Sequence, residues 1–443
     1  MAKRRDVVIL SSAALFAIWF FRLHYGARES ILQTWVIPLV APNEVADAND
    51  LYYTSPVNEE LKAVCRDANW DTRLVFTCDK SFGGIGNLRN SILLCVRFAI
   101  LAGAALVTPR IVTRDDDISN YKTSNTAEFS YMFDDEHFAE SLRVSCPQMH
   151  LYTTLEDAVQ ERNFVVDPDQ IHLEADFLLG EGLVQPAAWR EKFNEWLAQQ
   201  SATLESGSDT TDNTMVVNID RCYMSYPIYS DGAAFANSFS SILNLRKDIR
   251  LLATGVIHGL AERFSFTSLD LSQPTLPGAF FGAHLRTEKD AIATWSAEYG
   301  WTHATYEAQV TDYLAQVESG RSEPNGIYLA SGDVGETQRF VADAAARGWT
   351  ALGKFDVLGP EEVEVLRTLR WDQQAAVDYL VLLKASDFAG VAHSSFSWSV
   401  ALKRHLAANM TEAYPNAPEH FRDDLSVIYG TKGSEDFLQA LWP

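Results

Sequence analysis

The sequence has few cysteines and little positive charge, and each shortage argues against a class of function. Its 443 residues include 5 cysteines, with no CxxC pair and no histidine pair at zinc spacing. A structural metal site is therefore not expected. Lysine and arginine number 36 against 59 aspartates and glutamates, and the net charge is -23. A nucleic acid or an anionic membrane surface is not the expected partner, so any anionic ligand would need a local site.

The composition is otherwise that of a globular protein, with 47% hydrophobic and 12% aromatic residues and no internal repeat. The length predicts two or three domains with ample core.

Residues 1–25 have the pattern of a membrane anchor. Lys3, Arg4 and Arg5 precede the uncharged stretch VVILSSAALFAIWFF, which ends at Arg22. The bulky end of this stretch lacks the small residues of a cleavage site, which favours an uncleaved anchor over a cleaved signal peptide. The basic flank predicts a cytosolic N-terminus and a lumenal body. The short span favours the membrane of the Golgi or endoplasmic reticulum.

A lumenal body permits one or two disulfides among Cys65, Cys78, Cys95, Cys146 and Cys222, but their pairing cannot be read from the sequence. We expect Cys95, in an apolar helix, to be the unpaired buried thiol. Residues 26–71, rich in proline and acidic clusters, are predicted to form a stem.

The folded body begins with a strand, a glycine loop and a helix. The strand candidate RLVFTC starts at Arg73, the loop GGIGNLRN follows, residues 91–105 are an apolar helix, and ALVTP is the next strand. The glycines allow a ligand to approach the backbone at a helix start, where anions are favoured. The alternative is a plain strand-to-helix turn. The loop matches neither the dinucleotide fingerprint nor the P-loop.

A second alternating block begins near residue 277. Its expected strands are PGAFFGAHLR, NGIYLASGD, WTALGKFDVL and DFAGVA, and its expected helices are GETQRFVADAAARG, AAVDYLVLLKAS and HSSFSWSVALKRHL. Such alternation predicts a parallel sheet covered on both faces. The expected fold class is α/β, with Rossmann-like lobes over residues 72–275 and 276–443. A ligand is expected at the carboxyl ends of the strands, in the cleft between the lobes.

Polar residues follow three of these strands, in HLRTEKD, SGD and HSSFS. Arg286 offers a planar fork for phosphate oxygens, and Ser394 and Ser395 offer hydroxyls and helix N-terminal amides. Structural alternatives are an ion pair of Arg286 with Glu288, a helix cap by the serines, and a core position for His284.

These segments together resemble the GDP-fucose O-fucosyltransferase superfamily, in its fungal or plant-like branch. The resemblance rests on GGIGNLRN, HLRTEKD, IYLASGD and ASDFAGVAHSSFSWSVALKR and covers most of residues 73–405. It implies a GT-B fold, a type II anchor in the secretory pathway and GDP-fucose as donor. It also implies inversion at fucose C1 without a metal or other cofactor, and a protein or glycan hydroxyl as acceptor.

The resemblance also implies site residues. Those expected to bind the donor are Gly83, Gly84, Gly86, Asn87, His284, Asp387, Ser394, Ser395 and Phe396. Asn87 would lie near the diphosphate or the fucose, His284 would touch the nucleotide, and Asp387 would address the guanosine end. The segment Ser394 to Phe396 would surround the phosphates. Arg286 would hold the β-phosphate and stabilise its charge as GDP leaves.

One position departs from the pattern of the superfamily. Some members carry a glutamate in the glycine loop as general base, where this chain has Gly84. Glu288 is our candidate base, with Asp290 as an alternative, and a mainly dissociative reaction would need little help from a base.

Two other functions stay open. Asp115 to Asp117 contain a DxD pattern, by which other glycosyltransferases hold a metal and a nucleotide sugar; a solvated acidic loop is the structural alternative. A protein that binds a GDP-sugar without transferring it would also fit the loss of the loop glutamate.

Overall fold

A computed structural model describes residues 50–78, 81–114, 125–162, 172–174, 178, 182–205, 214–298, 300–320, 323–407, 421–430 and 437–443. The predicted anchor, most of the predicted stem and Asp115 to Asp117 lie outside these residues. Within them, one helix, α3 (Ile85–Ala102), is long and apolar enough to cross a membrane. Because 89% of it is buried inside the protein, α3 is a core helix.

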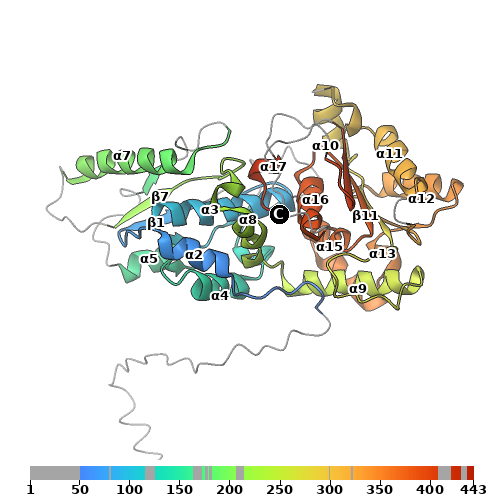
Figure 1. Ribbon diagram of the computed structural model, residues 1–443, viewed down its shortest axis with the longest axis horizontal. Helices are drawn as coiled ribbons and strands as arrows, with labels where there is room; N and C mark the ends of the chain where they lie inside the picture. Colours follow the sequence, from blue (N-terminus) through green and yellow to red (C-terminus); the bar gives the residue numbers. More distant parts are fainter. Residues whose placement is uncertain are drawn as a thin grey trace, which may run out of the picture. The chain divides into compact units, whose positions relative to one another are not determined.

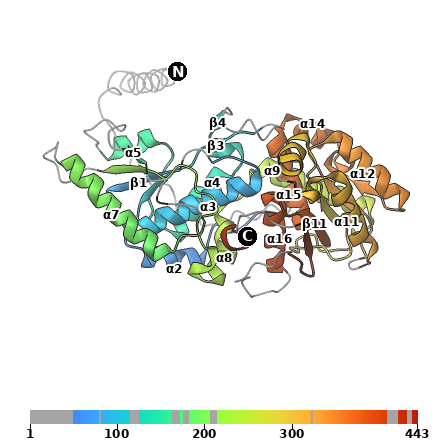
Figure 2. The ribbon, with the colours of Figure 1, turned by 90° about the horizontal axis from the view of Figure 1, so that it is seen from above.

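The first sheet is parallel and contains the predicted βαβ unit. Its strands are, in spatial order, β5 (Leu151–Tyr152), β2 (Ala105–Val107), β1 (Leu74–Thr77), β7 (Met215–Asn218) and β6 (His172–Glu174). Helix α7 (Pro186–Glu205) packs against α3 (Figures 1 and 2). Trp189 and Phe193, one turn apart on α7, stack with ring centroids 5.1 Å apart and contact Phe98 of α3 and Phe76 of β1. The spacing of these aromatic residues therefore fixes α7 over the sheet.

The second sheet is also parallel, which confirms the predicted α/β class. Its strands are β10 (Ala351–Leu352), β9 (Ile327–Ala330), β8 (Phe281–His284), β11 (Asp387–Val391) and β12 (Ser426–Tyr429). The helices that cover it are α15 (Trp371–Leu383) and α16 (Ser395–Ala407) on one face and α11 (Tyr306–Glu318) and α12 (Val334–Ala346) on the other (Figures 1 and 2). Both faces are covered, so the central strands β8 and β9 are buried throughout.

In the second sheet, one predicted strand is shorter than expected, and one observed strand was not predicted. In WTALGKFDVL only Ala351 and Leu352 pair with β9, and helix α13 (Lys354–Val357) follows. The strand ends there because the Asp356 carboxylate accepts a 2.7 Å hydrogen bond from the Gly353 amide and so starts the helix. Strand β12 was missed.

Two elements pack across the predicted boundary at residue 275. Helix α9 (Lys247–Arg263) lies along α15 of the second sheet. At the other end of the chain, α17 (Phe437–Ala440) leads into Trp442, which packs edge-on against Phe235 and Phe239. The chain therefore crosses between the two sheets more than once.

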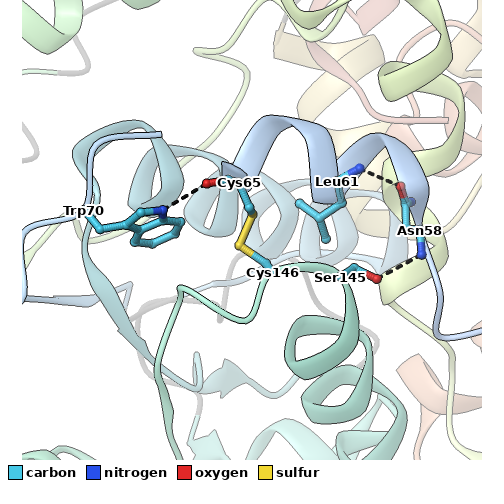
Figure 3. Close-up of a disulfide and its surroundings, with 6 residues drawn as sticks. All are labelled: Asn58, Leu61, Cys65, Trp70, Ser145 and Cys146. Carbon is cyan, nitrogen blue, oxygen red and sulfur yellow. Dashed lines mark hydrogen bonds between the residues drawn. A yellow bond between two sulfur atoms is a disulfide. The ribbon is translucent and has the colours of Figure 1, made fainter. Parts of the chain in front are cut away.

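The predicted stem contains a packed helix. Helix α2 (Glu59–Asp67) begins at Asn58, whose side chain accepts a 2.8 Å hydrogen bond from the Leu61 amide. Leu61 and Cys65 are fully buried, and a disulfide joins Cys65 to Cys146 at the end of α4 (Asp135–Ser145) (Figure 3). This part of residues 26–71 belongs to the folded body.

The prediction for Cys95 was wrong. Cys95 forms a disulfide with Cys78, and the buried unpaired thiol is Cys222. Helix α3 runs back along β1, which brings Cys95 to a Cα–Cα distance of 6.0 Å from Cys78, just after the strand. Apolar surroundings alone do not separate a buried thiol from a buried disulfide.

We expect the two disulfides to stabilise the protein unequally. Cys65 and Cys146 are 81 residues apart and Cys78 and Cys95 are 17 apart, so the first bond restricts the unfolded chain more. Replacing the first pair by alanine should cost about 4 kcal/mol and the second about 3 kcal/mol in urea unfolding. Strong reductant should lower the unfolding free energy of the parent protein toward the values of the two variants. An unchanged parent under reduction would contradict the assignment.

Candidate functional site

A cavity of about 920 Å³ lies between the glycine loop before α3 and the carboxyl ends of the second sheet's strands. Of the predicted site residues, all but Gly86 and Asp387 line it. The structure thus brings Gly83, Gly84 and Asn87 together with His284 and Arg286, and with Glu288, Ser394, Ser395 and Phe396. This is the strand edge where a parallel sheet is expected to hold a ligand.

The glycine loop is shaped by close packing. Gly83 has φ +111°, and a Cβ there would lie 2.5 Å from the side-chain nitrogen Nδ2 of Asn87. The side-chain oxygen Oδ1 of Asn87 accepts a 3.2 Å hydrogen bond from the Tyr223 hydroxyl. Gly86 lies behind the cavity wall, where a Cβ would lie 2.5 Å from the carbonyl oxygen of Ser395. Gly86 therefore lets the start of α3 touch the start of α16.

Two helices begin at this contact, and their first amides face the cavity. Helix α3 has 18 residues with Gly84 as its N-cap, and α16 has 13 residues and begins at Ser395. The sequence places no acidic residue in the first turn of either helix. Their partial positive charges are therefore left for an anion.

Arg286 and Glu288 form a buried ion pair at the cavity wall. Only 7% of Arg286 and 8% of Glu288 is exposed. The Arg286 guanidinium contacts one Glu288 oxygen, and the other accepts a 3.1 Å hydrogen bond from the Gly332 amide. The main chain of Arg286 is bound at both its N–H and its C=O by the Gln309 side chain. The ion pair between Arg286 and Glu288, the structural alternative given above, is thus present. Each oxygen of the Glu288 carboxylate has one polar partner.

His284 lies beside this pair as a neutral ring. Its Nδ1 is 2.7 Å from the Ser397 hydroxyl, and its ring stacks on Phe396 at a centroid distance of 4.2 Å. Burial, with a contribution from the charge of Arg286, lowers the pKa of His284 to about 3. The ring therefore stays uncharged at neutral pH.

The structure does not bring Asp387 into the cavity. Asp387 opens β11, at the strand end opposite the cavity, and accepts a 2.8 Å hydrogen bond from Gln316.

A different carboxylate, Asp378, lines the wall. It pairs with Lys354 at 2.6 Å and accepts a 2.6 Å hydrogen bond from the Tyr328 hydroxyl. Burial raises the pKa of Asp378. The signal that could have revealed it is one acid inside the apolar helix AAVDYLVLLKAS.

Arg114 fills the space beside Gly84. A Cβ at Gly84 would lie 3.3 Å from an Arg114 guanidinium nitrogen. That guanidinium stacks over the Trp371 ring at 5.1 Å, and the Arg114 amide donates a 3.1 Å hydrogen bond to Asp372. The other Asp372 oxygen accepts from the Tyr131 hydroxyl at 2.6 Å. A cation thus lies beside Gly84.

Several lining residues had no sequence signal. They are Phe82, Arg114, Tyr223, Lys354, Trp371 and Asp372. Among the residues that the structure describes, no group of three or more His, Cys, Asp or Glu side chains is placed to hold a metal ion. The side chain of Asp290 lies outside the described part.

Comparisons set the chain beside known proteins. A sequence model of the GDP-fucose protein O-fucosyltransferase family matches residues 74–407. No curated protein matches significantly. Among solved structures, POFUT1 in complex with GDP is 12% identical over 81% of this chain and 99% of that chain, with a TM-score of 0.45. The fucosyltransferase NodZ from Bradyrhizobium is 12% identical over 76% and 94%, with a TM-score of 0.37. A mutant of FUT1 from Arabidopsis thaliana in complex with GDP is 10% identical over 78% and 73%, with a TM-score of 0.35.

Replacing Gly86 by alanine should force the two helix starts apart. The new Cβ would meet the Ser395 backbone, which cannot rotate away. We expect a loss of about 1–3 kcal/mol in unfolding free energy, together with weaker nucleotide binding. Gly84→Ala is the matched control, because its Cβ meets only the end of a flexible arginine side chain. Equal stability of the two variants would contradict this account of Gly86.

His284 should make the protein less stable in acid. Its folded pKa is about 3, whereas an unfolded histidine has a pKa of about 6.5. Between these values only the unfolded state binds the proton, so stability is lost as pH falls below about 6.5. Between pH 7 and pH 5, His284→Gln should reduce the loss of unfolding free energy by about 2 kcal/mol. The surface variant His258→Gln serves as the control. An unchanged pH profile in His284→Gln would disprove the neutral, buried state.

Proposed function

Because the chain belongs to the GDP-fucose protein O-fucosyltransferase family, we propose that it transfers fucose from GDP-fucose to a hydroxyl group of a protein or glycan acceptor. The transfer would invert fucose C1 and need no metal ion. One observation carries the proposal: Arg286 and the N-termini of α3 and α16 face a single cavity. Such a convergence of donors suits a diphosphate.

In the proposed reaction the acceptor oxygen forms a bond to fucose C1 while the bond from C1 to the β-phosphate oxygen breaks. The electron pair of that bond leaves with GDP, so negative charge grows on the diphosphate. The Arg286 guanidinium and the first amides of α16 would stabilise this charge from fixed positions in a partly dry cavity. The proton of the acceptor hydroxyl must leave in the same step or just after it.

Glu288 is better placed to accept this proton when its ion pair opens, because one oxygen then loses its bond to Arg286. In the described state both carboxylate oxygens are occupied, by Arg286 and by the Gly332 amide. A diphosphate that draws Arg286 away would release one oxygen of Glu288. The proposed base is therefore linked to donor binding. A dissociative reaction with little help from a base is the alternative.

Asp378 is the better candidate for the guanosine end than Asp387. It lines the cavity, whereas Asp387 lies at the opposite end of its strand. The guanine edge offers an N1–H and an amino group, and a carboxylate can accept from both. Tyr328 and Lys354 hold the Asp378 carboxylate in place.

We also propose a GT-B arrangement of two Rossmann-like lobes and a type II membrane protein of the Golgi or endoplasmic reticulum. The parallel sheets on either side of the cavity support the first proposal. The basic and apolar pattern of residues 1–25 supports the second. The disulfides Cys65–Cys146 and Cys78–Cys95 are typical of an oxidising compartment.

A second candidate is a protein that binds the GDP-sugar without transferring fucose. The occupied Glu288 and the glycine at position 84 favour it.

Calorimetric titration of the full chain with GDP, GDP-fucose, GDP-mannose and UDP-GlcNAc, with and without EDTA, tests the proposal. We expect binding of GDP and GDP-fucose that EDTA does not change. Arg286→Ala should weaken GDP binding at least about tenfold, since it removes a charged hydrogen-bond partner of the diphosphate. The exposed Arg347→Ala, which breaks only a surface pair with Glu318, is the matched control.

Each other outcome has a distinct meaning. Binding of a UDP-sugar that EDTA abolishes would refute the proposal and favour the DxD alternative at Asp115 and Asp117. Binding of GDP-fucose without transfer to protein or glycan acceptors would favour the second candidate. Absence of all nucleotide binding would refute both candidates.

A further inference from the structure

Ser397 lies under His284, away from the ligand side of the cavity wall. It belongs to the first turn of α16 and is fully buried. His284 ends β8, which pairs in parallel with β11, and α16 follows β11. Gly390 of β11 leaves room for the serine, because a Cβ there would lie 2.6 Å from the Ser397 hydroxyl oxygen. Two neighbouring strand ends therefore bring the hydroxyl against the ring.

The hydrogen bonds of Ser397 have a direction. The Val391 amide donates to the Ser397 oxygen at 3.1 Å, and this oxygen lies 2.7 Å from Nδ1 of His284. Since the hydroxyl already accepts from Val391, its own proton is available for Nδ1. The neutral ring can accept that proton at Nδ1 only when its single N–H is on Nε2.

We propose that Ser397 is a positioning residue that donates to Nδ1 of His284 and keeps the ring proton on Nε2, the nitrogen that faces the cavity. His284 then acts as a hydrogen-bond donor toward the ligand and not as a proton acceptor. Stacking on Phe396 at a centroid distance of 4.2 Å restrains rotation of the ring about its Cβ–Cγ bond, so that Nδ1 stays beside Ser397. That the Nε2–H meets a phosphate oxygen rests on the function proposed above; the tautomer does not.

Nitrogen NMR of the ¹⁵N-histidine-labelled full chain without ligand tests the tautomer directly. His284→Gln assigns the two ring signals by their disappearance. We expect an unprotonated Nδ1 and a protonated Nε2 in the parent protein. In Ser397→Ala the ring should populate the Nδ1–H tautomer. Ser399→Ala is the matched control, since Ser399 is buried on the same helix but binds Arg89 and Tyr379.

A parent protein with its proton on Nδ1, or a tautomer unchanged in Ser397→Ala, would overturn the proposal. Because the first of these results does not depend on Ser397→Ala, a poorly folded Ser397→Ala would not leave the proposal undecided. Ser397→Thr keeps a hydroxyl and should restore the parent tautomer wherever it folds.

Titration with GDP and with guanosine then separates this role from a purely structural one. Ser397→Ala should weaken GDP binding by about tenfold or more, the effect of one hydrogen bond to a charged group, and leave guanosine binding unchanged. An equal loss of affinity for GDP and for guanosine would show that Ser397 has only a structural role. If the parent binds no nucleotide, the proposed function fails while the NMR result still decides the tautomer.

Discussion

The backbone contact between α3 and α16 is the constraint on which the cavity depends. Gly86 has no room for a side chain against Ser395, so two helix N-termini meet at one point. A 2.8 Å hydrogen bond from Arg89 of α3 to Ser399 of α16 holds the helices together beyond it, and the bonds of Asn90 to Ala440 and Trp442 attach α3 to the C-terminal segment. Because the partial charges of both N-termini are positive, they repel in the empty protein. Packing elsewhere must offset this repulsion, and a bound anion removes it.

Two cations in the cavity wall are each paired with a carboxylate. Arg286 is paired with Glu288, and Lys354 is paired with Asp378. Removing two charges from water is costly, and a buried pair is seldom more stable than apolar residues of the same size. We interpret these pairs as charged groups that are held in the cavity, each balanced by its partner, until a ligand replaces that partner. A ligand with negative oxygens can take over the cation, and a ligand with N–H groups can take over the carboxylate, without leaving a buried charge alone.

The sequence allowed prediction of much of the fold, because the period of apolar residues reports which faces are buried. His284, Arg286 and Ser394 could be placed at the cavity because they directly follow strands whose carboxyl ends share an edge. Asp378 could not, because its neighbours across the wall come from α13 and β9, distant in sequence. The family resemblance pointed to Asp387, yet the direction of β11 puts that residue at the wrong edge. The pairing of Cys95 likewise depended on a contact between elements.

The arrangement of donors and acceptors limits where the acceptor proton can go. From the second sheet, the diphosphate would meet the Arg286 guanidinium, the His284 ring and the α16 amides, all of which donate once the ring proton lies on Nε2. On the first-sheet side, the described lining residues include no carboxylate: they are Phe82, Gly83, Gly84, Ile85, Asn87, Arg114 and Tyr223. Glu288 is paired with Arg286, and departure of Arg286 frees one of its oxygens. It follows that donor binding itself would prepare the base, so a glycine at position 84 is compatible with transfer.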